Sequence, residues 1–157
     1  MEASVGTRAR ALSHYDITCG KAIALAFAGF QGVDPPPLVW LVFAAMVRRR
    51  TGGTADGLNN PLLLEGAGWA GAVGRLGGGP ETRAPADTAL FATLDDGCRA
   101  AALLFQFKDC DAARSAYRAG EPLGLAAAIE ASPPGRSLGM DGLAEEIGSR
   151  ARSRRSA

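Results

Sequence analysis

The sequence is poor in the residues that build metal centres, disulfide frameworks and nucleophilic active sites. Its 157 residues include one histidine, His14, and three cysteines, none of them in a Cys-x-x-Cys motif. Three cysteines cannot all pair within one chain, so Cys19, Cys98 and Cys110 are expected to be small buried thiols. With a single histidine and no Gly-x-Ser-x-Gly motif, nothing indicates a zinc site or a nucleophilic hydrolase. We expect no metal and no other cofactor.

Long apolar runs and an excess of one charge are also missing. The longest apolar segments, residues 22–30 and 38–47, fall short of the roughly 20 residues that a membrane-spanning helix needs. The first starts too late, and after too polar a stretch, to be the core of a signal peptide. We therefore expect no membrane span and no signal peptide. The formal net charge of +1 argues against a protein that coats nucleic acid with its whole surface.

Basic residues are nevertheless concentrated at the C-terminal end. Fifteen of the seventeen are arginines, and the last eight positions contain four of them: Arg150, Arg152, Arg154 and Arg155. Residues 149–157 are predicted to form a mobile arginine-rich tail, either solvated or acting as a contact arm for phosphate or another acidic surface. At the opposite end, residues 1–12 are expected to form a flexible leader.

The apolar content, 47% of the residues, is ample for one hydrophobic core. Residues 13–148 are predicted to form a single compact, mainly α-helical domain. Capping and proline signals place helices at Ser13–Phe30, Pro37–Val47, Thr93 to about Phe107, Asp109 or Asp111 to Gly120, Pro122–Ser132 and Met140–Ile147. The second of these helices is apolar on every side and should be central in the core.

One segment breaks the helical pattern. Residues 52–85 contain ten glycines and three prolines, which excludes a long regular helix and favours turns, with room for a short β-hairpin. Between Pro35 and Leu64 the only carboxylate is Asp56, and Glu65 follows directly. Either one would have to be kept protonated by burial to act as a general acid, whereas an aspartate next to glycine is more often a turn residue.

The order of several short motifs carries more information than any one of them. Gly52-Gly53 and Leu58-Asn59-Asn60-Pro61-Leu62 follow the apolar helix, and three more segments come after the glycine-rich stretch: Phe91–Ala101, Tyr117–Leu123 and Ala127–Pro133. This order resembles a lysozyme-like family found in phage tail proteins, endolysins and actinobacterial cell-wall hydrolases, over roughly residues 27–135. The resemblance implies a compact helical lobe. It also implies a glutamate at the end of the core helix, just before Gly-Gly, that protonates the glycosidic oxygen of peptidoglycan.

The chain departs from that family at the position of the glutamate. Arg50 or Thr51 stands there, and neither side chain can donate a proton at any reachable pH. Two smaller departures are Leu63-Leu64, in place of a polar residue after the motif, and Pro134, in place of a tryptophan after the last Ser-Pro. The resemblance then implies a fold kept without its proton donor. The former cleft would be lined by Arg48, Arg49, Arg50, Asn59 and Asn60. These residues would bind glycan, bind peptide carboxylates or pair with another subunit, because the arginine guanidinium matches a carboxylate with two parallel hydrogen bonds.

Three functions stay open on the sequence. The first is a non-catalytic lysozyme-like structural or cell-wall-binding component of a phage or phage-tail-like particle, cytoplasmic before assembly, whose partners are other subunits or peptidoglycan. The second is an active peptidoglycan glycosidase that uses Asp56 or Glu65 as its acid. The third is a virion or assembly protein whose arginine tail contacts nucleic acid. A plainer explanation of Arg48–Arg50 is that cations suit the C-terminal end of a helix dipole.

Overall fold

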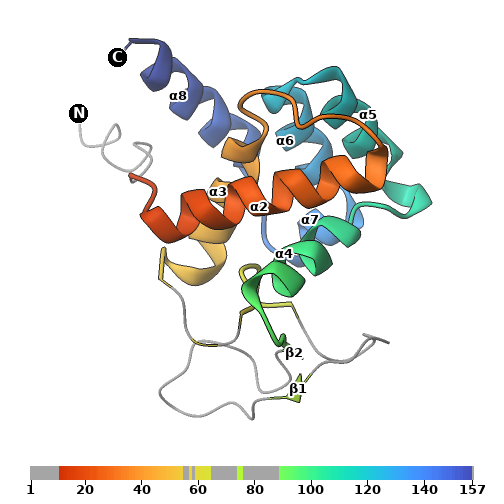
Figure 1. Ribbon diagram of the computed structural model, residues 1–157. Helices are drawn as coiled ribbons and strands as arrows, with labels where there is room; N and C mark the ends of the chain where they lie inside the picture. The colour runs from red at the N-terminus through yellow and green to blue at the C-terminus, as the bar shows by residue number, and fades with distance from the viewer. Residues whose placement is uncertain (1–10, 55–56, 58, 65–73, 76–88, 157) are drawn as a thin grey trace.

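The computed structural model describes residues 11–54, 57, 59–64, 74–75 and 89–156 (Figure 1). These residues form α2 (His14–Gln31), α3 (Trp40–Thr51), α4 (Leu94–Leu103), α5 (Asp111–Ala119), α6 (Pro122–Ala131), α7 (Pro133–Ser137) and α8 (Leu143–Ser156). A 3-10 turn, η1 (Lys108–Cys110), precedes α5. Strand β1 (Gly74–Arg75) pairs antiparallel with β2 (Ala89–Leu90). The predicted mainly α-helical fold is confirmed. No helix in the described ranges is long and apolar enough to cross a membrane.

The core is organised around α2 and α3. α2 packs on both α3 and α4, and α6 packs on α5 and α8 (Figure 1). Every residue from Leu41 to Val47 on α3 is almost completely buried. A helix that is apolar on every side needs such all-round cover, so α3 is the central helix that the sequence predicts.

A cluster of aromatic rings joins four segments of the core. The ring of Phe27 on α2 lies 4.2 Å from that of Tyr117 on α5 and 5.7 Å from that of Phe43 on α3, between centroids. It also stacks on Phe105, in the turn after α4, at 6.4 Å. Each such pair adds about 0.5–1.5 kcal/mol beyond the burial of area. The Tyr117 hydroxyl donates to the Ala24 carbonyl, and burial raises the pKa of Tyr117 to about 12.

Several helix ends lie where the capping residues predict them. Ser13 and Asp16 form a capping box at the start of α2, in which each side chain accepts from the other residue's backbone N–H, at 3.1 and 2.8 Å. Thr93 caps α4 by accepting from the Asp96 N–H. Gly32 and Gly120 end α2 and α5 in the left-handed region.

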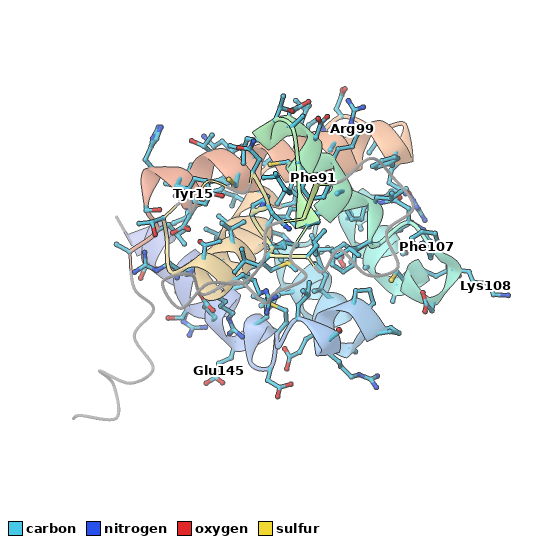
Figure 2. All side chains as sticks on the ribbon, turned by 90° about the horizontal axis from the view of Figure 1, so that it is seen from below. Tyr15, Phe91, Arg99, Phe107, Lys108 and Glu145 are labelled. Carbon is cyan, nitrogen blue, oxygen red and sulfur yellow. The ribbon has the colours of Figure 1, made fainter. Side chains whose placement is uncertain are left out.

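Other predicted boundaries are wrong, and one of them is the start of the last helix, at Leu143 and not at Met140. α3 begins at Trp40 and not at Pro37, because Leu38 takes a left-handed φ of 68° that no helix can include. α4 ends at Leu103 and not near Phe107. The N–H groups of Phe105 and Gln106 donate to the carbonyls of Ala102 and Leu103, three residues back, in place of the α-helical partners four residues back. Figure 2 shows Phe107 at the edge of the molecule, where 58% of it is exposed.

The arginine-rich C-terminus is also different from the prediction. α8 continues past the expected end at Ile147 to Ser156, so residues 149–156 are helical. Arg150 Nε donates to Glu146 Oε2 at 2.8 Å, one turn earlier, and the Arg154 guanidinium lies 5.3 Å from the centre of the Trp40 ring. These contacts stabilise the last turns of the helix. Of the predicted leader, residues 1–10 lie outside the described residues, and Leu12 packs against the core.

Candidate functional site

The Asn-Asn-Pro turn is fastened to β2 by Asn60. Its side chain is buried, and Nδ2 donates to the carbonyls of Leu64 and Ala89, both at 2.9 Å. Oδ1 accepts from the Leu64 N–H at 2.8 Å. Both amide hydrogens and the amide oxygen are therefore used within the fold, which is what a buried side-chain amide requires.

Asn59 fastens the same turn to the start of α4. Its Nδ2 donates to the carbonyls of Phe91 and Ala92, at 2.9 and 3.3 Å. The backbone of the turn touches α4 at Gly97, where an added Cβ would lie 1.8 Å from the Asn59 carbonyl oxygen. Only glycine permits this approach, so the turn and α4 form one packed unit.

Arg50 and Thr51, at the position where the resemblance places the glutamate, both bind backbone. Arg50 Nε donates to the Leu62 carbonyl at 2.8 Å, and Nη2 donates to the Leu63 carbonyl at 3.2 Å. Thr51 Oγ1 donates to the Val47 carbonyl at 2.9 Å and accepts from the Gly53 N–H at 3.1 Å. The two residues connect the C-terminal end of α3 to the turns that follow it.

Arg48 and Arg49 point away from Arg50 and from each other. Arg48 Nη1 lies 3.7 Å from the buried Asp16 carboxylate on α2. Arg49 Nε lies 2.9 Å from Glu146 on α8, and its Nη1 donates to the Asp141 carbonyl at 2.6 Å. Successive side chains on an α-helix are separated by about 100° around the axis. The three arginines therefore reach α2, α8 and the Asn-Asn-Pro turn, and the structure does not gather them on one cationic surface.

The other sequence-predicted residues lie on α8 or outside the described residues. Asp56 and Glu65, the candidate acids, lie outside the described residues. On α8, Arg150 is 9% exposed and shares Glu146 with Arg49, whereas Arg152 and Arg154 are exposed. Arg155 lies on the helix, but its side chain is outside the described part. Across the described positions, no group of three or more His, Cys, Asp or Glu side chains could hold a metal ion.

The three cysteines are buried and unpaired, as predicted. Cys98 Sγ donates to the Cys19 carbonyl at 3.9 Å, which connects α4 to α2. A hydrogen bond to the Cys19 side chain and burial raise the pKa of the Cys98 thiol well above its ordinary range. A thiol that stays protonated and covered is a poor nucleophile, so Cys98 acts as a packing residue.

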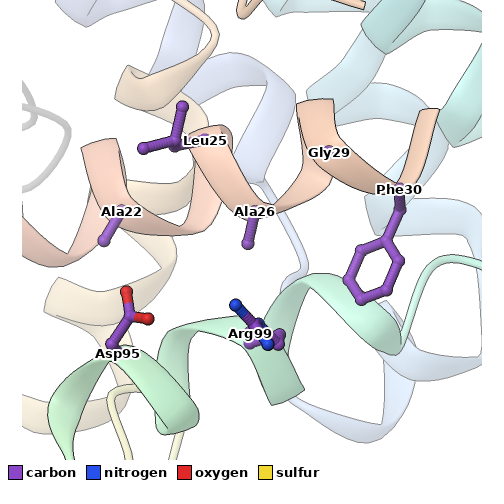
Figure 3. Close-up of a pocket in the computed structure, with 7 residues that line it drawn as sticks. All are labelled: Ala22, Leu25, Ala26, Gly29, Phe30, Asp95 and Arg99. Carbon is purple, nitrogen blue, oxygen red and sulfur yellow. The ribbon is translucent and has the colours of Figure 1, made fainter. Parts of the chain in front are cut away.

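Sequence reasoning missed a groove of about 410 Å³ between α2 and α4 (Figure 3). Its lining residues on α2 are Ala22, Leu25, Ala26, Gly29 and Phe30, and those on α4 are Asp95 and Arg99. The signal in the sequence is a second apolar face on α2. The small residues at 22, 26 and 29 recur at helical spacing, away from the buried positions 19, 23 and 27.

Comparison with protein-family models, with curated proteins and with solved structures finds no match to this chain. The lysozyme-like resemblance therefore rests on its motifs and their order.

Proposed function

We propose that the chain is a non-catalytic, lysozyme-like structural or cell-wall-binding component of a phage or phage-tail-like particle. The observation that carries the proposal is the pair of hydrogen bonds from Arg50 to the carbonyls of Leu62 and Leu63. The position that would hold the proton donor in the resembling family holds a cation that fastens the backbone. Glycoside hydrolysis needs a carboxylic acid at the leaving oxygen, and a guanidinium has no dissociable proton at working pH.

The remaining contacts favour the structural role over glycan binding. Arg48 and Arg49, expected to hold acidic groups of a ligand, are already paired with Asp16 and Glu146. Breaking such a pair to bind a ligand would cost the charge-assisted bonds that connect α3 to its neighbours. A surface other than this helix end is therefore the better candidate for contact with other subunits.

A turbidity assay on purified peptidoglycan tests the absence of catalysis, with an active lysozyme as positive control. We expect no clearing by the purified chain. Clearing that disappears in Asp56→Asn or Glu65→Gln would overturn the proposal in favour of an active glycosidase. Size fractionation of the native source tests the structural role, because a particle component should be recovered with the large assembly and not as free protein.

The nucleic-acid alternative is separated by its salt dependence. Binding through the α8 arginines would weaken steeply as salt rises and would be reduced by Arg154→Gln together with Arg155→Gln. Tight, salt-steep DNA binding that these substitutions abolish would replace the structural proposal with that alternative.

A further inference from the structure

The groove between α2 and α4 has an open apolar floor and exposed apolar side chains at its edges. Ala22, Ala26 and Gly29 contribute little or no side chain, and an added Cβ on Gly29 would meet nothing within 4 Å. Leu25 is 64% exposed and Phe30 is 43% exposed. Burying large apolar side chains is worth about 1.5–3 kcal/mol each, so this face gains free energy when a partner covers it.

Asp95 and Arg99 place one charge of each sign beside the apolar floor. They are one helical turn apart on α4, and both face α2 across the groove in Figure 3. Both side chains are exposed, and no salt bridge within the described ranges involves either of them. The edge of the groove therefore carries an acid and a base that are available to a partner.

A pair of opposite charges one turn apart is complementary to itself when the second helix runs antiparallel. Across a two-fold axis, the acid of each copy meets the base of the other, so one pair produces two intermolecular contacts. A nucleic acid or a phosphate would meet the Asp95 carboxylate, which repels it. The charge pattern therefore selects a second copy of this chain over an acidic ligand.

We propose that the α2–α4 face binds a second copy of the chain across a two-fold axis. The two α4 helices run antiparallel, with Asp95 of each copy against Arg99 of the other. Leu25 and Phe30 of each copy cover the small residues of the opposite groove. This proposal is independent of the proposed function, because that function rests on the Arg50 contacts at the C-terminal end of α3, whereas the groove is formed by α2 and α4.

Sedimentation velocity of the full chain over a wide range of concentrations is the first test. We expect a reversible monomer–dimer equilibrium of about micromolar strength, as suits an interface at the small end of the usual range. Arg99→Asp leaves two acids on each face. In a two-fold interface each substitution is present in both copies and changes two contacts. We therefore expect the dissociation constant to rise by roughly tenfold or more. Lys108→Asp is the matched control, since it changes the net charge equally and lies away from Arg99 in Figure 2.

Charge exchange makes the test specific for this face. The double variant Asp95→Arg/Arg99→Asp should dimerise again, because it reverses both members of the pair in both copies. Asp95→Arg alone and Arg99→Asp alone should self-associate more weakly than the wild type but should form a heterodimer when mixed. Gly29→Leu should abolish the dimer while the helical circular dichroism is kept, because the added side chain fills open space.

Three outcomes would overturn the inference: a wild-type chain that stays monomeric at every concentration, a dimer that survives Arg99→Asp and Gly29→Leu, and a charge exchange that does not restore association. None of these results bears on the peptidoglycan assay, so this inference and the proposed function can fail separately.

Discussion

Replacing Arg50 with glutamate places a carboxylic acid at one of the two positions, Arg50 and Thr51, where the lysozyme-like resemblance implies one. It also removes the contacts that the structure shows for Arg50. In the folded chain the guanidinium donates to the carbonyls of Leu62 and Leu63, at 2.8 and 3.2 Å. Hydrogen bonds to charged groups contribute about 1.5–3 kcal/mol each. The side chain of Arg50 is half-buried, so water can hydrogen-bond to the two carbonyls when the guanidinium is removed. The lower end of the range of about 1.5–3 kcal/mol, at about 1.5 kcal/mol per bond, therefore applies. The glutamate carboxylate would also place negatively charged oxygens beside these two carbonyl oxygens, and the groups would repel each other. We expect Arg50→Glu to lower the free energy of unfolding by about 3 kcal/mol.

Urea unfolding followed by circular dichroism measures this loss directly, and a thermal scan should show a midpoint about 6–12 °C lower. Arg50→Lys keeps the positive charge but has one ammonium nitrogen in place of the planar guanidinium. Its free energy of unfolding should lie between those of the wild type and Arg50→Glu. Arg49→Gln is the matched neighbour, and its partly exposed ion pair with Glu146 should cost only about 1 kcal/mol or less.

Two results would refute the reasoning. Equal stability of Arg50→Glu and the wild type would show that the two hydrogen bonds of Arg50 do not hold the turn in place. A gain of peptidoglycan clearing in Arg50→Glu would show that this position still faces a competent cleft, which contradicts a purely structural role.

The other predictions concern a close contact, a cap and a buried phenol. Gly97→Ala should cost about 1–3 kcal/mol in urea unfolding, because its Cβ meets the Asn59 carbonyl, whereas Gly29→Ala should not destabilise the fold. The Glu130 carboxylate accepts hydrogen bonds from two N–H groups at the start of α8, and these bonds lower its pKa in the folded state. The stability that this group contributes is therefore present above its unfolded pKa and is lost as the pH falls through its folded pKa. Glu130→Gln should make the free energy of unfolding less dependent on pH in this acid range. Burial raises the pKa of Tyr117 to about 12, so a difference spectrum of the wild type against Tyr117→Phe should show phenolate absorbance only near that pH. Because the unfolded phenol loses its proton near pH 10, the free energy of unfolding of the wild type should fall between about pH 10 and 12.

Local capping chemistry made much of the helical fold predictable. The starts of α2 and α4 follow from side chains that bond to backbone a few residues away: Ser13, Asp16 and Thr93. Each of these capping contacts joins residues within one helical turn of each other and does not depend on residues far away in the sequence. The start of α3 could not be found this way, because no residue near Leu38 gives a local signal for its left-handed conformation.

The candidate site was less predictable, because the direction of a side chain depends on its tertiary partner. Three consecutive arginines indicate a basic helix end, but nothing in the sequence shows that Arg48 reaches α2 while Arg49 reaches α8. The partners lie far along the chain, and Glu146 is 97 residues from Arg49. The same limit applies to the second half of α8, because the sequence indicated a helix only as far as Ile147 and a mobile tail from residue 149.

Asn60 has a consequence for engineering the chain. Its single side chain holds Leu64 and Ala89, the two ends of a long connection, beside each other and in contact with the core. The free energy needed to close a loop rises by only about 0.6 kcal/mol for each doubling of its length. Because these contacts join Leu64 to Ala89 directly, lengthening the chain between the two residues should cost little free energy and should leave the helices in place.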